Sequence, residues 1–339
     1  MASGIASGQN EGPLAEGTCL MLLIRFAALL IAFMTVACAS VADPPAENPP
    51  SDRRIAITFD DAPLGPRARG DWDRAGALIA ALDAAGVQAA FFATTKGFDD
   101  LTDGRDRVAR YAAAGHLIAN HTHTHPWLHQ TEADAYLADI DEAERRLSGL
   151  PNRRAWFRYP FLDQGRGDAE KRGAVWAGLA ERGLNEGYVT ADTYDWHLDE
   201  RWRRAVRDGT RVDEAALEAV YAAMVADAAE HAYGLAEARL GAQPVHVLLL
   251  HENDAAAAFI GAGIAALREA GWTVVTPDEA YAEPLRRPDV TTGFTGAGRV
   301  AALSWEAGAR GPEAFDHWSA SKEGLDERLA REGAIPPLP

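Results

Sequence analysis

The sequence predicts an α/β protein, an incomplete (β/α) barrel of about seven βα units followed by a C-terminal extension. Short apolar runs alternate with Ala-rich amphipathic segments from Ile55 to Thr276, as in repeated βα units. Several of the amphipathic segments are closed by Gly, which is typical of a helix C-terminus. The units lack a Gly-rich phosphate loop, which favours a barrel over a dinucleotide-binding sheet.

The elements follow from residue type and spacing. Strands are expected over the apolar runs, at Ile55–Phe59, Gln88–Thr94, Leu117–Ala119, Ala155–Arg158, Gly187–Thr190, Val245–Leu250 and Trp272–Thr276. Helices are expected where apolar residues recur at helical spacing, at Trp72–Ala85, Arg105–Ala114, Glu132–Leu147, Ala169–Arg182 and Ala255–Ala270. A longer helix is expected over Val212–Leu240, with an interruption near Gly234.

The first 51 residues predict a leader and a spacer. An apolar run follows Arg25, and Ala37-Cys38-Ala39 is an A-x-A cleavage site, which indicates a secretory signal at about 21–39. We therefore expect export to a periplasmic or extracellular location. A lipoprotein at Cys38 is a weaker alternative, because Thr35 stands where a lipobox prefers Leu. An uncleaved anchor is the third alternative, but the run is short for a membrane span, so we expect no stable span in the mature chain.

The domain organisation follows from these patterns. After the leader and spacer (1–51), we expect a catalytic barrel over 52–285 and an extension over 286–339. The extension lacks strand alternation, and we expect Trp305 and Trp318 to anchor it on the barrel.

Composition narrows the class of partner. The chain has 339 residues, 47% hydrophobic, which is enough for a full core. Its net charge of -17 argues against nucleic acid or an anionic membrane surface and favours a neutral or cationic substrate. The two cysteines, Cys19 and Cys38, precede the barrel, so a metal in the barrel would be held by His and carboxylate.

Polar clusters follow the first and third predicted strands, where a (β/α) barrel places its functional residues. The first strand runs into Asp60 and Asp61, a pair that alone would indicate a solvated turn. The third leads to His121, His123 and His125, and three histidines so close together indicate a metal site. A helical turn would bring His121 and His125 together, whereas an extended segment would favour either adjacent pair. Spacing alone leaves these alternatives open.

Three later strands end in further candidates. Arg158 is either a surface charge or a bidentate clamp on a carboxylate. Asp192 and Asp195 precede Trp196, an aromatic residue that either stacks on a sugar ring or packs. His251 emerges from an almost wholly apolar strand, a position suited to an acid or base.

Five segments together resemble the polysaccharide deacetylase superfamily, carbohydrate esterase family four. They are TFDD, NHTHTH, RYPF, DTYDW and LLLH, in this order from Thr58 to His251. The resemblance implies a distorted (β/α) barrel and a divalent metal, most often zinc. It also implies an N- or O-acetylated glycan as substrate, such as chitin oligomers, peptidoglycan or xylan.

The resemblance implies a role for each matching residue. The metal ligands would be Asp61, His121 and His125, with His123 a bystander. Asp60 would be the general base.

Arg158 would orient that base. His251 would be the general acid, and Asp192 would pair with it and raise its pKa.

The remaining roles concern the substrate. The backbone N–H of Phe161, after Pro160, would face the oxyanion, and Trp196 would wall the groove. The sequence departs from the family pattern in lacking a Gly soon after Phe161 and in the length of Val212–Leu240.

The sequence therefore predicts an exported, metal-dependent hydrolase that removes acetyl groups from a glycan. Two alternatives use the same barrel. One is hydrolysis of a small amide or cyclic imide, and the other is a non-catalytic barrel that binds glycans through Trp127 and Trp196.

Overall fold

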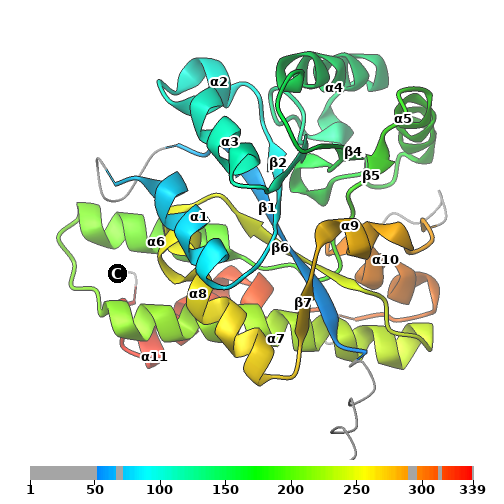
Figure 1. Ribbon diagram of the computed structural model, residues 1–339. Coiled ribbons are helices and arrows are strands. Elements are labelled where there is room, and N and C mark those ends of the chain that lie inside the picture. The colour runs from blue at the N-terminus through cyan, green and yellow to red at the C-terminus, as the bar shows by residue number, and fades with distance from the viewer. Residues whose placement is uncertain (1–51, 66–71, 289–295, 312–314, 338–339) are drawn as a thin grey trace, which may run out of the picture. The chain divides into compact units, whose positions relative to one another are not determined.

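A computed structural model describes residues 52–65, 72–288, 296–311 and 315–337 (Figure 1). The leader, signal and spacer predicted for 1–51 lie outside these ranges. No helix within these ranges is both long enough and apolar enough to cross a membrane.

In the described residues, seven parallel strands form one curled sheet in the order β5-β4-β3-β2-β1-β6, with β7 also paired to β1. The strands are β1 (Arg54–Ala62), β2 (Ala90–Ala93), β3 (Leu117–Asn120), β4 (Arg153–Phe157), β5 (Asn185–Glu186), β6 (His246–His251) and β7 (Thr273–Val275). Just past β5, Ala191 forms a parallel bridge with Leu248 of β6, so the two ends of the sheet approach each other. The predicted incomplete, distorted barrel is confirmed.

β1 pairs with three strands, β2, β6 and β7, and carries the first candidate site residues. It pairs with β6 along one edge, where Asp60 lies opposite His251. Six consecutive residues of β1, from Ile55 to Asp60, are buried, as expected of a strand covered on both faces. The strand is longer than predicted and continues through Asp61 to Ala62, so both carboxylates project from the strand itself.

Helices cover the sheet in sequence order. They are α1 (Arg74–Ala84), α2 (Gly97–Asp100), α3 (Gly104–Ala113), α4 (Ala133–Leu147), α5 (Ala169–Glu181), α6 (Asp195–Arg207), α7 (Glu214–Leu240), α8 (Asp254–Glu269), α9 (Pro277–Ala282), α10 (Gly298–Glu306) and α11 (Lys322–Arg331). Single 3₁₀ turns are η1 (Leu128–Gln130), η2 (Pro160–Leu162) and η4 (Trp318–Ala320).

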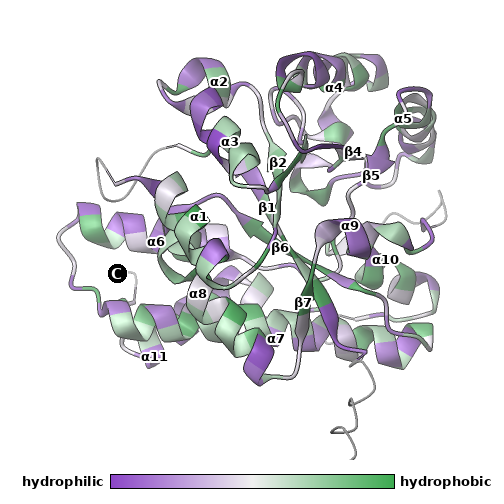
Figure 2. Cartoon of the chain, viewed as in Figure 1, coloured by the Kyte–Doolittle hydropathy of each residue, from purple (hydrophilic) through white to green (hydrophobic). Residues whose placement is uncertain are grey.

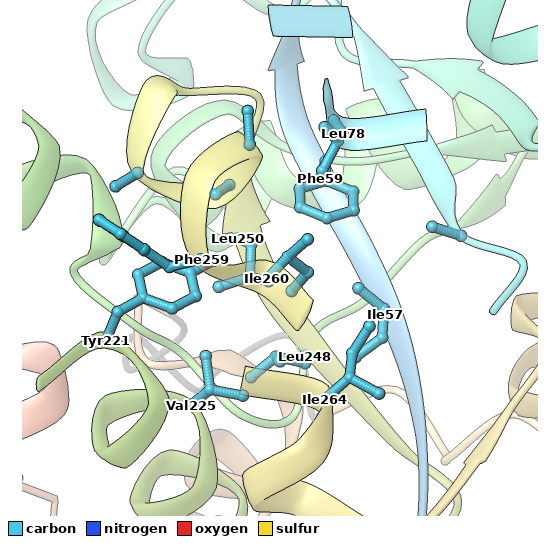
Figure 3. Close-up of a cluster of buried hydrophobic side chains, with 14 of the residues drawn as sticks. Ile57, Phe59, Leu78, Tyr221, Val225, Leu248, Leu250, Phe259, Ile260 and Ile264 are labelled. Carbon is cyan, nitrogen blue, oxygen red and sulfur yellow. The ribbon is translucent and has the colours of Figure 1, made fainter. Parts of the chain in front are cut away.

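The main core lies between the sheet and helices α1, α7 and α8. Figure 3 shows Ile260 and Ile264 of α8 packed toward Leu248 and Leu250 of β6, with Tyr221 of α7 close by; all five belong to one buried cluster. In Figure 2, α8 is largely hydrophobic, whereas α4 carries mostly hydrophilic residues. This core fixes the relative positions of β1 and β6, the two strands that end at the site.

One predicted strand is wrong. Gly187–Thr190 forms no strand, and β5 lies just before it. The Gly187 N–H donates to the carbonyl of Phe157 on β4, whereas the N–H groups of Thr190 and Ala191 donate to Val247 on β6. The segment crosses from one end of the sheet to the other, so it cannot continue as a ladder with either strand.

Two helix expectations also need correction. α7 runs without a break through Gly234. α6 was not predicted, because its many charged residues hide the buried face formed by Leu198, Trp202 and Ala205.

The described part of the C-terminal extension contacts α6 and α7. Trp318 Nε1 donates to Asp227 of α7, and the Tyr194 N–H just before α6 donates to the carbonyl of Ser319. His197 and Arg201 of α6 both contact the Asp326 carboxylate of α11.

Candidate functional site

The carboxyl ends of the central strands meet at one cavity of about 510 Å³. β1 contributes Asp60 and Asp61, the turn after β3 contributes His121 and His125, and β6 contributes His251. The cavity wall also includes three other predicted site residues, Phe161, Asp192 and Trp196. The predicted residues Arg158 and Pro160 are buried beside the cavity.

Three side chains in this cavity form a candidate metal centre. One donor atom from each of Asp61, His121 and His125 lies within 4.8 Å of the other two. Asp61 Oδ1 is 3.1 Å from His125 Nε2 and 3.5 Å from His121 Nε2. This oxygen is buried and has no hydrogen-bond partner among the residues that the structure describes. Such an oxygen is costly to bury unless a ligand satisfies it.

The protonation of this group suits a cation. His121 Nδ1 donates to the Arg158 carbonyl at 2.9 Å, which leaves Nε2 with its lone pair toward Asp61. Burial lowers the pKa of His121 to about 4, so the ring is neutral at physiological pH. Burial acts to raise the pKa of Asp61, but His125, His251 and His121 hold it well below its usual range. The donor set of one carboxylate and two imidazoles fits zinc and related divalent metals.

A sharp turn, rather than a helix, brings His121 and His125 together. Thr122 and His125 have positive φ angles of 69° and 59°, and Thr122 Oγ1 accepts from the His125 N–H at 3.0 Å. Residues other than Gly rarely adopt this conformation. The Asp139 carboxylate of α4 accepts from the N–H groups of His123 and Thr124 and so fixes the turn from outside.

His123 contacts Thr95 and is not one of the candidate metal ligands. Its Nδ1 lies 3.0 Å from Thr95 Oγ1, and it is not in the three-residue cluster. Neither adjacent histidine pair is therefore the chelating one.

Arg158 holds Asp60 by one oxygen. Arg158 Nη1 donates to Asp60 Oδ1 at 2.6 Å and to Thr58 Oγ1 at 2.8 Å. Its Nε donates to the Gly187 carbonyl and its Nη2 to the Tyr281 hydroxyl. The guanidinium is thus neither a surface charge nor a bidentate clamp. It fixes Asp60 Oδ1, while Oδ2 lies 3.6 Å from His121 Nε2.

The partner of His251 is Asp195, and the expectation that Asp192 would pair with it is wrong. His251 Nδ1 donates to Asp195 Oδ1 at 2.7 Å, and the His251 N–H donates to Asp195 Oδ2 at 2.9 Å. Asn253 Nδ2 also donates to Asp195 Oδ2. Burial alone would lower the pKa of His251, but Asp195 outweighs it and raises that pKa to about 10.

The helix start explains this choice of aspartate. Asp195 is the first residue of α6 and is fully buried beneath His251. Asp192 lies three residues earlier on the cavity wall, where burial raises its pKa to about 7. An amphipathic pattern starting at Asp195 was the only signal in the sequence that distinguished the two.

Part of this chain is similar in sequence to known proteins. A profile of the polysaccharide deacetylase family matches residues 47–172, which contain the three candidate metal ligands and Arg158. Over these residues the chain is similar to the polysaccharide deacetylase family. This is a family of metal-dependent carbohydrate deacetylases.

Individual relatives match parts of the chain. A chitooligosaccharide deacetylase from Rhizobium leguminosarum bv. trifolii is 36% identical over 96 residues, 28% of this chain and 40% of its own length. A peptidoglycan-N-acetylglucosamine deacetylase from Bacillus cereus is 28% identical over 149 residues, 44% of this chain and 48% of its own length. The chain therefore spans less than half the length of these two relatives.

One solved structure aligns with much of this chain. A polysaccharide deacetylase from Bacillus cereus, 20% identical, aligns with a TM-score of 0.48 over 69% of this chain and 96% of its own.

A buried ion cluster behind the site holds the segment after β1, and no pattern in the sequence predicted it. Glu252, next to His251, accepts from the Leu64 N–H at 2.7 Å and from the Tyr111 hydroxyl at 2.7 Å. Arg74 and Arg107 both contact the Glu252 carboxylate and donate to the Leu64 carbonyl. Since Leu64 lines the cavity, this cluster fixes one wall of it.

Aromatic residues form another part of the cavity wall. The Phe161 ring stacks on Trp127, with centroids 3.6 Å apart and the ring planes 3° apart. Phe161 is 43% exposed, and its φ of 58° turns the chain within η2. A paired, accessible aromatic face of this kind suits the C–H face of a sugar ring.

The ligand assignment predicts which histidine variants lose metal. We expect His121→Ala and His125→Ala to lose most of the bound divalent metal, about 10–100-fold in affinity or more, because each removes a ligand. His123→Ala is expected to keep it, since its ring faces Thr95. Metal analysis of the three purified proteins tests this. Loss of metal in the His123 variant alone would contradict the assignment.

Proposed function

We propose that this protein is a metal-dependent hydrolase that removes acetyl groups from the N-acetylglucosamine units of a glycan. The observation that carries the proposal is the position of two charged pairs beside one ligand set. Asp60 is held by Arg158 and His251 by Asp195, and both border the same cavity as Asp61. A protein that only binds glycans would not need a base and an acid flanking a metal.

Asp61, His121 and His125 would hold the cation. A divalent metal, by our proposal zinc, supplies Lewis-acid chemistry, because it acidifies water and polarises a carbonyl. These three side chains leave room on the cavity side, as a catalytic rather than a structural centre requires.

Asp60 and His251 would move the protons. As water adds to the acetyl carbonyl carbon, Asp60 takes a proton from that water, and Arg158 holds its carboxylate in position. When the carbon–nitrogen bond breaks, protonated His251 gives its proton to the leaving amine. Acetate and a free amino sugar are the products. The raised pKa of His251 keeps this proton available at neutral pH.

The wall residues would place the substrate. We propose that the backbone N–H of Phe161 faces the developing oxyanion and that Trp196 walls the groove. Preorganised N–H groups of this kind stabilise charge that appears only in the transition state.

Two further observations support the choice of substrate. The net charge of -17 suits a neutral glycan whose product is cationic. Relatives that match this chain are named chitooligosaccharide, peptidoglycan-N-acetylglucosamine and chitin deacetylases. We also propose that the protein is exported, on the basis of the sequence at 21–39.

Acetate release tests the proposal. We expect the protein with zinc to release acetate from N-acetylglucosamine oligomers, to lose that activity with a chelator, and to regain it when zinc is restored. Peptidoglycan and acetylated xylan are measured in parallel. Activity on a small amide or cyclic imide alone, or binding of oligomers without acetate release, would contradict the proposal.

A further inference from the structure

A second cavity, of about 790 Å³, adjoins the catalytic one. Three residues, Asp192, Tyr194 and Gly296, line both cavities. The two therefore meet at the segment between β5 and α6. A glycan bound in the catalytic cavity could therefore extend along the surface into the second cavity.

The C-terminal extension builds most of this second cavity. Its far side is α7, with Ala232 and Leu235, and its near side is the segment around η4 and the start of α11. The residues of the extension lie beyond the part of the chain that the family profile matches. The family profile therefore assigns no role to the residues that line this cavity.

The lining combines aromatic rings with carboxylates. Tyr194, Phe315 and Trp318 provide aromatic surface, and none of them is fully buried. Trp318 is fixed by donating from Nε1 to Asp227 at 3.1 Å.

The carboxylates come from Asp192, Asp316 and Glu323, and Asp316 and Glu323 are exposed. They can accept hydrogen bonds from hydroxyl or amino groups.

One positively charged side chain of this lining, Lys322, lies close to the catalytic cavity. Lys322 Nζ lies 5.0 Å from the centroid of the Trp196 ring, which lines that cavity. Lys322 therefore connects the two sites, and carboxylates dominate the charge of the second cavity. An anionic polymer would be repelled there, whereas a neutral or amino-bearing sugar would be accepted.

We propose that the second cavity binds further sugar units of the same glycan and makes the enzyme select oligomers over short substrates. This inference rests on the proposed function, because it assumes the same reaction. The residues that would bind the additional sugars are different from the proposed catalytic residues. Aromatic faces would carry the sugar rings, and the carboxylates would bind their polar groups. The C-terminal extension is then a substrate-binding element as well as a structural one.

Chain-length dependence tests the proposal. For the full-length protein with zinc, we expect kcat/KM on an N-acetylglucosamine pentamer to exceed that on the dimer by about tenfold. Leu235→Trp fills the cavity and is expected to bring this ratio to about one. Glu323→Gln removes one carboxylate and is expected to lower the ratio by a smaller factor.

Matched controls separate binding from folding. Ala238→Trp adds the same ring at an exposed position of α7, and Glu327→Gln removes a carboxylate at an exposed position of α11. Both are expected to keep the wild-type ratio, and thermal unfolding checks that all variants fold. An unchanged ratio in Leu235→Trp would overturn the subsite while leaving the deacetylase intact.

Binding measured by calorimetry with the same two oligomers separates the two proposals. Tighter binding of the pentamer, lost in Leu235→Trp, would support the subsite even if no acetate were released, a result that would overturn only the proposed reaction. Equal binding of both oligomers would overturn the subsite.

Discussion

The Asp60→Asn variant is expected to lose turnover by about 10²–10⁴-fold while keeping its metal. Asparagine has nearly the same shape as aspartate, but its amide cannot take a proton from water. Asp60 is not among the three residues that group as ligands, so metal content should not fall. Acetate release and metal analysis on the same preparation measure both effects.

A matched variant sharpens this result. Asp61→Asn changes the neighbouring carboxylate, a ligand, and is expected to lose metal together with activity. An Asp60→Asn protein with normal turnover would remove Asp60 from the mechanism. Loss of metal in that variant would instead make Asp60 a ligand.

The second large effect is expected for Asp195→Asn, as a change in the pH profile. In the proposed mechanism His251 must be protonated to release the amine, and its pKa of about 10 keeps it so through neutral pH. Activity should therefore fall as the pH rises through that value. Without the Asp195 carboxylate the pKa of His251 falls, so the alkaline limb moves to lower pH. At pH 8 we expect activity to drop by about 10²-fold.

The neighbouring aspartate provides the control. Asp192 lies on the same segment as Asp195. Within the part of the chain that the structure describes, Asp192 makes no hydrogen bond to His251. In Asp192→Asn, the alkaline limb of the pH–activity profile is expected to move much less than in Asp195→Asn. The reverse order of the two shifts would show that Asp192, not Asp195, tunes the acid. Metal content should stay normal in both.

The positions of the candidate metal ligands and of Asp60 were predictable because their signals are local. Asp60 and Asp61 end a single apolar strand, and His121 and His125 lie in one short segment. Strand alternation places both segments at the same edge of the sheet, since parallel strands share a carboxyl end. The structure adds which two histidines converge on Asp61, and it shows that a turn with positive φ angles, which no periodicity encodes, brings them together.

The hydrogen-bond partner of His251 was not predictable on the same basis. Asp192 and Asp195 have the same side chain and lie three residues apart, and His251 is distant in sequence. The choice depends on where α6 begins and how it packs, and its apolar face is hidden among charged residues. The failed strand at Gly187–Thr190 has a related cause, because that segment divides its hydrogen bonds between β4 and β6.

The sequence by itself determined the βα alternation, the residue types of the site and the order of the motifs. These depend on patterns within a few residues of one another, which express burial and local backbone preference. Only the tertiary structure decided that Asp195 holds His251, that Glu252 fixes the wall at Leu64, and that the extension shapes a second cavity. Each of these is a contact between distant segments, and packing of the whole core selects it from several equivalent side chains.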